Sequence, residues 1–152
     1  MSDRNVTHAT FTLERDYPAT PAAVFAAWSD PATKARWFAG GSARHELDFR
    51  VGGRETAKGV HDGVELSFET LYQELVPDER LVYTSTMYWG ETVATVSLTA
   101  VEFVATESGT HLVVTEHGVY LDGHEQPAWR EQGTADQLSA LAQELEGAAT
   151  SR

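Results

Sequence analysis

Six segments with strand character follow one another between His45 and Leu121, and this run constrains the fold more than any other feature of the sequence. The segments are rich in β-branched and aromatic residues, and Gly-Gly, Asp-Gly and Pro-Asp pairs mark turns between them. The expected strands cover residues 45–51, 54–60, 64–76, 80–89, 92–105 and 111–121. Because such short connections join antiparallel neighbours, the pattern predicts an antiparallel meander, and its long strands predict a sheet that bends.

Further elements are expected before this run. Residues 7–17 alternate between apolar and polar side chains and therefore predict a first strand. Thr20 and Asp30 are each followed by proline, which is the signature of a helix start. Two short helices are therefore expected at residues 20–28 and 30–37.

A long helix is expected after the run, at residues 125–145, with Gly147 ending it. Its apolar stripe, at helical spacing, consists of Trp129, Leu138, Leu141, Ala142 and Leu145. The sheet and this stripe must bury each other, yet a sheet that curls around a helix cannot touch it along its whole length. The sequence thus predicts an α+β fold in which a curved seven-stranded antiparallel sheet wraps a long C-terminal helix and leaves an internal cavity.

Length and composition favour one soluble domain. The chain has 152 residues, 41% of them hydrophobic, which is enough to bury a core without metals or cross-links. We expect a single domain over residues 1–152, with its core at about residues 7–147. The absence of cysteine excludes disulfides, thiolate metal sites and cysteine nucleophiles, and it is typical of a reducing compartment. No export signal or apolar span is recognisable, so a cytoplasmic protein is expected.

Net charge and missing motifs exclude several classes of function. The formal charge of -12 repels nucleic acid and anionic membranes, so neither is expected as a partner. The chain contains no nucleophile elbow, phosphate-binding glycine loop or HExxH motif, so no catalytic residue, cofactor or metal is expected. The six histidines lack metal-ligand spacing and are expected on the surface.

Glu116 is the acid with the strongest case for a functional role. Strand periodicity places it on one apolar, and therefore inward, face of the last strand. The residues that share this face are Leu112, Val114, Gly118 and Tyr120. A carboxylate in such a place has a raised pKa and could hydrogen-bond a ligand or act as a general acid or base. The alternative is an ion pair with a basic residue such as Arg54 at the cavity mouth, or a solvated position at the strand end.

Three motifs resemble those of a known family. Residues 30–38 contain Asp-Pro and Arg-Trp-Phe, residues 48–54 read Asp-Phe-Arg-Val-Gly-Gly-Arg, and residues 74–83 read Glu-Leu-Val-Pro-Asp-Glu-Arg-Leu-Val-Tyr. They occur in order within a resemblance that spans about residues 11–145. The chain thereby resembles bacterial relatives of the C-terminal domain of the activator of the heat-shock protein 90 ATPase, which belong to the START-like, or SRPBCC, helix-grip superfamily.

The resemblance implies a mostly apolar cavity gripped between the sheet and the last helix. Across the superfamily such cavities bind lipids, sterols, polyketides and other hydrophobic molecules, and only some branches are catalytic. This chain departs from the family where Gly133 is followed by Thr134 rather than by tryptophan, which is expected to alter one cavity wall. Trp129 lies one helical turn earlier and is expected to compensate in part.

Aromatic side chains and a few polar side-chain groups are expected to line the cavity. The polar groups are expected to come from Arg54, Tyr83, Glu116 and Tyr120. The complete set of candidate ligand-binding residues is Trp28, Trp37, Phe49, Arg54, Phe68, Tyr83, Met87, Val114, Glu116, Tyr120, Trp129, Gly133 and Gln137.

Three functions are compatible with the sequence. We favour a non-enzymatic protein that binds a small hydrophobic molecule of lipid-like or polyketide-like character. The first alternative is a stress-response partner that activates the chaperone ATPase, although the chain has no room for a second, chaperone-binding domain. The second is a small cyclase or hydrolase that uses Glu116 as its acid or base. An exposed edge strand could also pair two copies into a homodimer.

Overall fold

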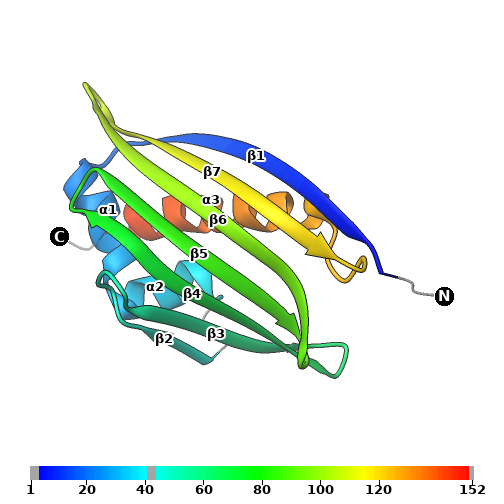
Figure 1. Ribbon diagram of the computed structural model, residues 1–152. Helices are drawn as coiled ribbons and strands as arrows, with labels where there is room; N and C mark the ends of the chain where they lie inside the picture. Colours follow the sequence, from blue (N-terminus) through cyan, green and yellow to red (C-terminus); the bar gives the residue numbers. More distant parts are fainter. Residues whose placement is uncertain (1–3, 41–43, 151–152) are drawn as a thin grey trace.

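A seven-stranded antiparallel sheet and three helices make up the computed structural model, which describes residues 4–40 and 44–150 (Figure 1). The elements in chain order are β1 (Val6–Tyr17), α1 (Pro21–Ser29), α2 (Pro31–Phe38), β2 (Arg44–Leu47), β3 (Arg54–His61), β4 (Val64–Val76), β5 (Arg80–Trp89), β6 (Thr92–Thr106), β7 (Gly109–Leu121) and α3 (Pro127–Thr150). The sheet order is β1-β7-β6-β5-β4-β3-β2. The predicted fold class, element order and meander are therefore confirmed.

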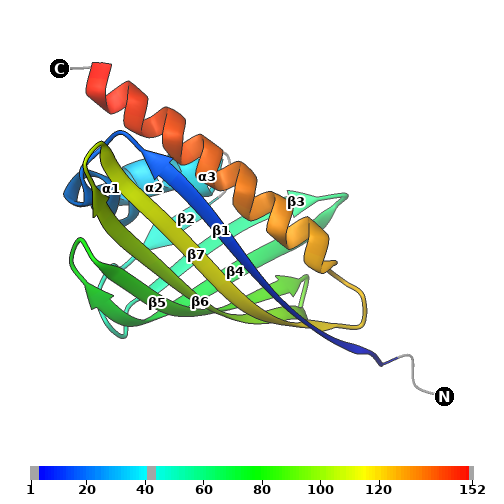
Figure 2. The same cartoon turned by 90° about the horizontal axis from the view of Figure 1, so that it is seen from above.

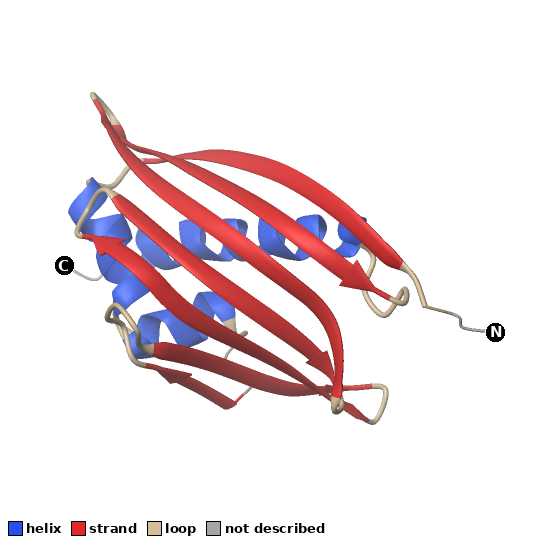
Figure 3. Cartoon of the chain, viewed as in Figure 1, coloured by secondary structure: helices blue, strands red, loops and turns tan. Residues whose placement is uncertain are grey.

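The helices all lie on one side of the sheet, so the molecule has two layers (Figures 2 and 3). The long helix α3 crosses this face obliquely, and α1 and α2 lie together near its C-terminal half. Register shifts leave one residue unpaired in β4, Gln73, where it pairs with β5, and one in β6, Ala94, where it pairs with β5. Such irregularities increase bend and twist, which helps the sheet to curve around α3.

Side-chain caps start both short helices as predicted. Thr20 Oγ1 accepts a hydrogen bond from the backbone N–H of Ala23, at 3.2 Å. Asp30 Oδ2 accepts one from the backbone N–H of Thr33, at 3.0 Å. Asp30 ends α1 and begins α2, so the chain turns within one residue and directs the tryptophans of both helices into the core.

The strand β2 is shorter than the predicted span of residues 45–51 because a tight turn begins at Asp48. The backbone N–H of Arg50 donates to Asp48 O at 3.1 Å, and that of Gly53 donates to Arg50 O at 2.8 Å. Gly52 has a φ of +80°, and a Cβ on Gly53 would collide with Asp48 O. The Gly-Gly pair is thus required for this turn, and pairing to β3 stops at Leu47.

The helix α3 begins and ends later than predicted. Pro127 occupies its first position, where the missing N–H costs nothing. Gly147 does not end the helix, which runs on to Thr150. A glycine inside a helix costs only about 1 kcal/mol relative to alanine, so its helix-forming neighbours outweigh it.

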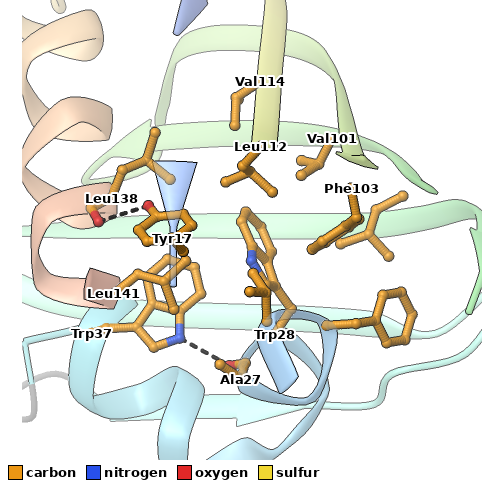
Figure 4. Packing of buried hydrophobic residues seen from close by; sticks show 13 residues of the cluster. Tyr17, Ala27, Trp28, Trp37, Val101, Phe103, Leu112, Val114, Leu138 and Leu141 are labelled. Atoms are coloured by element: carbon orange, nitrogen blue, oxygen red, sulfur yellow. Dashed lines mark hydrogen bonds between the residues drawn. The ribbon is translucent and has the colours of Figure 1, made fainter. Parts of the chain in front are cut away.

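The core gathers at the end of the sheet that α1 and α2 cover (Figure 4). Trp28 and Trp37 pack edge to face, with ring centroids 4.8 Å apart. Two hydrogen bonds satisfy polar atoms there: Trp37 Nε1 donates to Ala27 O at 2.9 Å, and Tyr17 Oη donates to Leu138 O at 2.8 Å. The second bond anchors α3 to β1. Within the described residues, none of the helices has the length and apolar character needed to cross a membrane.

Candidate functional site

A cavity of about 340 Å³ lies between the sheet and the N-terminal half of α3. Its wall is formed by α1, α2, α3 and residues of β3, β4, β5 and β7. Trp129 on α3 lines the cavity and is 63% exposed, so it marks the mouth. The cavity has an aromatic region beside the core and a group of charged side chains beneath the start of α3.

Aromatic rings from three elements form the first region. Trp28 comes from α1, Trp37 and Phe38 from α2, and Phe68 from β4. The rings of Phe38 and Phe68 have centroids 5.9 Å apart, and those of Trp37 and Phe38 are also 5.9 Å apart. The buried Nε1–H of Trp28 has no hydrogen-bond partner among the described residues. This wall therefore offers broad apolar surfaces for a ring-shaped or aliphatic ligand.

Arg130 is the central cation of the charged region, and its side chain is 7% exposed. Its Nη2 donates to Glu125 Oε1 at 2.8 Å, and its Nε lies 3.1 and 3.2 Å from the two Glu125 oxygens. Glu125 also accepts a hydrogen bond from Thr95 Oγ1 at 2.6 Å. The guanidinium carbon lies 5.3 Å from the ring centroid of Phe68, which joins the two regions of the cavity.

Glu116 lies beside Arg130 on the cavity floor formed by β7. Its Oε1 accepts a hydrogen bond from Thr99 Oγ1 at 2.9 Å, whereas its Oε2 is 3.4 Å from Arg130 Nη1. Burial raises the pKa of the Glu116 carboxyl above its usual value, although Arg130 and Thr99 oppose the shift. Glu116 thus faces the cavity with few hydrogen bonds, and its basic partner is Arg130 rather than Arg54.

Two tyrosines near Glu116 are held in their neutral form. Burial raises the pKa of Tyr83, and the nearby Glu116 carboxylate raises it further. Burial also raises the pKa of Tyr120 to about 12, although Arg130 lowers it. Both phenols therefore keep their proton at neutral pH, so neither supplies a base to the cavity.

A second buried carboxylate, Glu55, lies outside the cavity wall. Its Oε1 accepts hydrogen bonds from Lys34 Nζ at 2.9 Å and from Tyr72 Oη at 2.5 Å, and its Oε2 lies 2.7 Å from His45 Nε2. Burial by itself would raise the pKa of Glu55. Lys34, His45 and Tyr72 outweigh this effect and lower the pKa to about 2. None of these four residues lines the cavity. We refer to them as the Glu55 network.

Lys34 connects the Glu55 network to the back of the aromatic wall. Its ammonium lies 4.4 Å from the ring centroid of Phe38 and 5.0 Å from that of Trp28. Burial lowers the pKa of Lys34, and the Glu55 carboxylate opposes that shift. The Lys34 ammonium is enclosed by the rings of Phe38 and Trp28 and by the Glu55 carboxylate, so it supports the aromatic wall from the side away from the cavity.

Ten of the thirteen candidate residues line the cavity. They are Trp28, Trp37, Phe68, Tyr83, Met87, Val114, Glu116, Trp129, Gly133 and Gln137. Their assignment as ligand-binding residues stays a prediction, because a position in the wall does not establish a contact with a ligand.

Three candidate residues lie elsewhere. Phe49 packs in the core, with its ring centroid 5.5 Å from that of Phe25. Arg54 is exposed at the start of β3, where its neighbour Glu55 points inward instead. Tyr120 is buried, and its ring covers the backbone of Gly118, where an added Cβ would collide with it. The period-two pattern of β7 was correct, but it could not distinguish cavity from core.

Sequence reasoning missed Arg130 and the Glu55 network, and it did not include Glu125 in the candidate set. Positions four and eight residues before Leu138 are Thr134 and Arg130, so continuing the helical stripe toward its start would have found the arginine. The expectation that all six histidines lie on the surface is wrong for His45, whose side chain is 3% exposed. No local pattern reveals the Glu55 network, since its members come from α2, β2, β3 and β4.

The curved antiparallel sheet, the long C-terminal helix and the two short helices after β1 define a helix-grip protein of the START-like, or SRPBCC, class. Residues 18–146 match the family model described as "Activator of Hsp90 ATPase homolog 1-like protein". The chain belongs to this family. The three motifs that suggested the resemblance lie in α2, in the turn after β2, and at the β4–β5 turn.

Solved structures share this fold over nearly the whole chain. An uncharacterized protein from Rhizobium leguminosarum is 40% identical, with a TM-score of 0.90, and the match covers 94% of this chain and 97% of that one. A protein from Rhizobium loti is 42% identical, with a TM-score of 0.86 and coverage of 92% and 99%. A protein from Chromobacterium violaceum is 26% identical, with a TM-score of 0.76 and coverage of 90% and 96%. A search of curated proteins finds no match.

Proposed function

We propose that the protein binds a small hydrophobic molecule in the cavity between the sheet and α3 and does not transform it. The observation that carries this proposal is the cavity itself, with aromatic side chains on one side and few polar groups on the other. A volume of about 340 Å³ falls within the range of roughly 300–1,000 Å³ that is typical of small-molecule sites.

The organisation of the wall supports a binding role. The aromatic rings come from separate elements that the core already fixes, so the cavity exists before a ligand arrives. A site of this kind loses little free energy to reorganisation when a ligand enters. The exposed Trp129 gives the mouth an apolar rim over which a hydrophobic ligand can pass.

A cavity-filling substitution tests the proposal. Gly133 lines the cavity, and an added Cβ there meets no atom within 4 Å, so Gly133→Trp should fit and fill the mouth. Gly147→Trp is the matched control, because Gly147 is also an unobstructed glycine of α3 but lies outside the cavity wall. Calorimetric titration with methoxynaphthalene, a neutral aromatic probe, should detect binding in wild type and in Gly147→Trp.

The expected result for Gly133→Trp is a loss of affinity of at least tenfold. Circular dichroism should show the same helix content in all three proteins. Failure of the probe to bind wild type would refute the proposal, as would equal affinities in Gly133→Trp and wild type.

An enzymatic role is the second candidate, and the buried Glu116 is the observation that favours it. Glu116 faces the cavity beside Arg130, and Tyr83 is a neutral hydrogen-bond donor in the same wall. This alternative predicts turnover of a carbonyl-containing substrate that disappears in Glu116→Gln. Binding of an unchanged ligand in stoichiometric amount would instead support the carrier role.

A role as a chaperone partner has only the description of the family in its favour. It predicts association with the heat-shock protein 90 chaperone and stimulation of its ATPase. Titration of the purified chaperone with this protein, with ATP hydrolysis as the readout, tests it directly. An unchanged ATPase rate at saturating concentrations would exclude this role.

A further inference from the structure

The charges around the cavity limit the charge of its ligand. Among the described residues, the charged side chains in the wall are Lys58 and Arg130, which are cations, and Glu116 and Glu125, which are carboxylates. The two signs balance. An anionic ligand would meet two carboxylates in a site of low dielectric, and a cationic one would meet the guanidinium and Lys58. The wall therefore favours a neutral ligand.

One of the two carboxylates is already committed to protein partners. Glu125 receives contacts from Nε and Nη2 of Arg130 and a short hydrogen bond from Thr95 Oγ1. This pair fixes the guanidinium plane, because two of its three nitrogens, Nε and Nη2, contact the same carboxylate. Arg130 is thus held in place by Glu125 and is not free to swing out and capture an anion.

Glu116 and the remaining nitrogen of Arg130 are far less satisfied. Nη1 lies 3.4 Å from Glu116 Oε2 and 3.4 Å from Ser97 Oγ, both longer than the usual N–H···O distance of about 2.9 Å. Glu116 Oε2 has no closer donor among the hydrogen bonds of the described residues. A spare acceptor and a spare donor therefore lie next to each other in the cavity wall.

A single neutral group can satisfy both atoms. A hydroxyl donates one hydrogen bond and accepts others, so its O–H can donate to Glu116 Oε2 while its oxygen accepts from Arg130 Nη1. Since hydrogen bonds to charged groups are the strong ones, the pairing would select for a hydroxyl. The apolar remainder of the ligand would then lie against Phe68 and Phe38.

We propose, on the basis of the proposed function, that the ligand is a neutral hydroxylated ring compound whose hydroxyl binds between Glu116 and Arg130. Glu116 is the specificity-determining residue, because its carboxylate accepts a hydrogen bond from a hydroxyl, which an ether or a hydrocarbon cannot donate. The aromatic wall supplies affinity without this discrimination.

Four matched naphthalenes test the chemistry of the head group. Naphthol, methoxynaphthalene, naphthoate and naphthylmethylamine share one ring system and differ in hydrogen bonding and charge. Each is titrated by calorimetry into wild type, Glu116→Gln and Glu131→Gln. Glu131→Gln is the charge-matched control, because Glu131 is an exposed residue of α3 outside the cavity wall.

We expect naphthol to bind wild type about tenfold more tightly than methoxynaphthalene, and both to bind more tightly than the two charged probes. Glu116→Gln should weaken naphthol about tenfold and leave methoxynaphthalene within about twofold, whereas Glu131→Gln should change neither.

Three results would overturn the inference and leave the proposed function standing. The first is equal binding of naphthol and methoxynaphthalene by wild type. The second is tighter binding of naphthoate or of the amine. The third is an equal loss of naphthol and methoxynaphthalene affinity in Glu116→Gln, which would remove the head-group role of Glu116. If none of the four probes binds, the proposed function and the inference both fail.

Discussion

Glu55 and Glu116 are both buried carboxylates on strands of the same sheet, yet their surroundings are opposite. Glu55 accepts hydrogen bonds from Lys34 and Tyr72 and pairs with His45, and its pKa falls to about 2. Glu116 has one short hydrogen bond, from Thr99, and its pKa is raised by burial. One carboxylate is saturated by its protein partners, and the other is left with an oxygen whose nearest donor, Arg130 Nη1, is 3.4 Å away.

The difference separates stability from binding. A saturated buried ion pair is strongly destabilising to break, because removal of one partner leaves an unpaired charge. An unsaturated carboxylate at a cavity costs stability and gains partners when a ligand arrives. The same residue type therefore supports the wall in the Glu55 network and faces the cavity at Glu116.

Removal of Lys34 should have the largest effect on stability. Lys34→Met leaves Glu55 buried without its ammonium, so the free energy of unfolding should fall by about 3–5 kcal/mol. Arg80→Met is the control, since Arg80 and its partner Glu74 are about half exposed and such pairs contribute about 0–1 kcal/mol. Urea denaturation measures both. A loss below about 1 kcal/mol in Lys34→Met would show that the network is not a major source of stability.

The two carboxylates should also give opposite pH dependence. The pKa of Glu55 is lower in the folded than in the unfolded state, so its contribution of about 3 kcal/mol is complete above pH 4.5 and is lost as the pH falls toward 2. The pKa of Glu116 is higher in the folded state, so its contribution becomes less favourable as the pH rises through the carboxyl range.

Denaturation curves recorded from about pH 2 to above pH 4.5 distinguish the contributions of the two carboxylates to the free energy of unfolding. Glu116→Gln should keep the acid-induced loss of stability seen in wild type, and Glu55→Gln should lack the part of it that comes from Glu55. Identical pH profiles for the two variants would contradict the contrast.

A smaller effect is expected when the unsaturated carboxylate is neutralised. Glu116→Gln should change the free energy of unfolding by no more than about 1 kcal/mol at neutral pH, in the stabilising direction, because a neutral amide avoids the cost of burying a charge. Arg130 keeps its pair with Glu125. Thermal and urea denaturation measure the change. A loss above about 2 kcal/mol would mean that Glu116 holds the fold together much as Glu55 does.

The smallest effect on stability is expected at the cavity mouth. Trp129→Ala removes an exposed side chain, so the free energy of unfolding should change by less than about 0.5 kcal/mol. The affinity for methoxynaphthalene should nevertheless fall several-fold, because the rim loses its apolar surface. Val104→Ala, an exposed apolar residue outside the cavity wall, is the control and should leave binding unchanged.

Local signals were sufficient to predict the elements and the meander. Thr20 and Asp30 cap their helices as expected, and the Gly52-Gly53 pair makes a turn that only glycine permits. The two errors of length, in β2 and α3, arose where a turn or a glycine competes with its neighbours by about 1 kcal/mol. Such competition is decided by the whole structure and not by the local sequence.

The candidate site was less accessible to sequence reasoning. Glu116 was found because a strand repeats every two residues, and its inward direction follows from its neighbours. Its partner Arg130 was missed because Trp129 was assigned to the buried face of α3, an error of one residue, or about 100° around the helix. The Glu55 network joins residues 11 to 38 positions from Lys34, and only the folded chain brings them together.

The register of β1 has a consequence for how the chain folds as it is synthesised. Val6 pairs with Leu121 and Tyr17 with Thr110, while the other strands pair only with neighbours in sequence. Among the described strands, the ribosome therefore releases β1 first and its partner, β7, last. Until β7 has been synthesised, β1 has no partner strand, and its backbone groups can form hydrogen bonds with strands of other chains. Closure of this long-range contact should be the slow step of folding, and nascent chains that end before residue 121 should depend on chaperones.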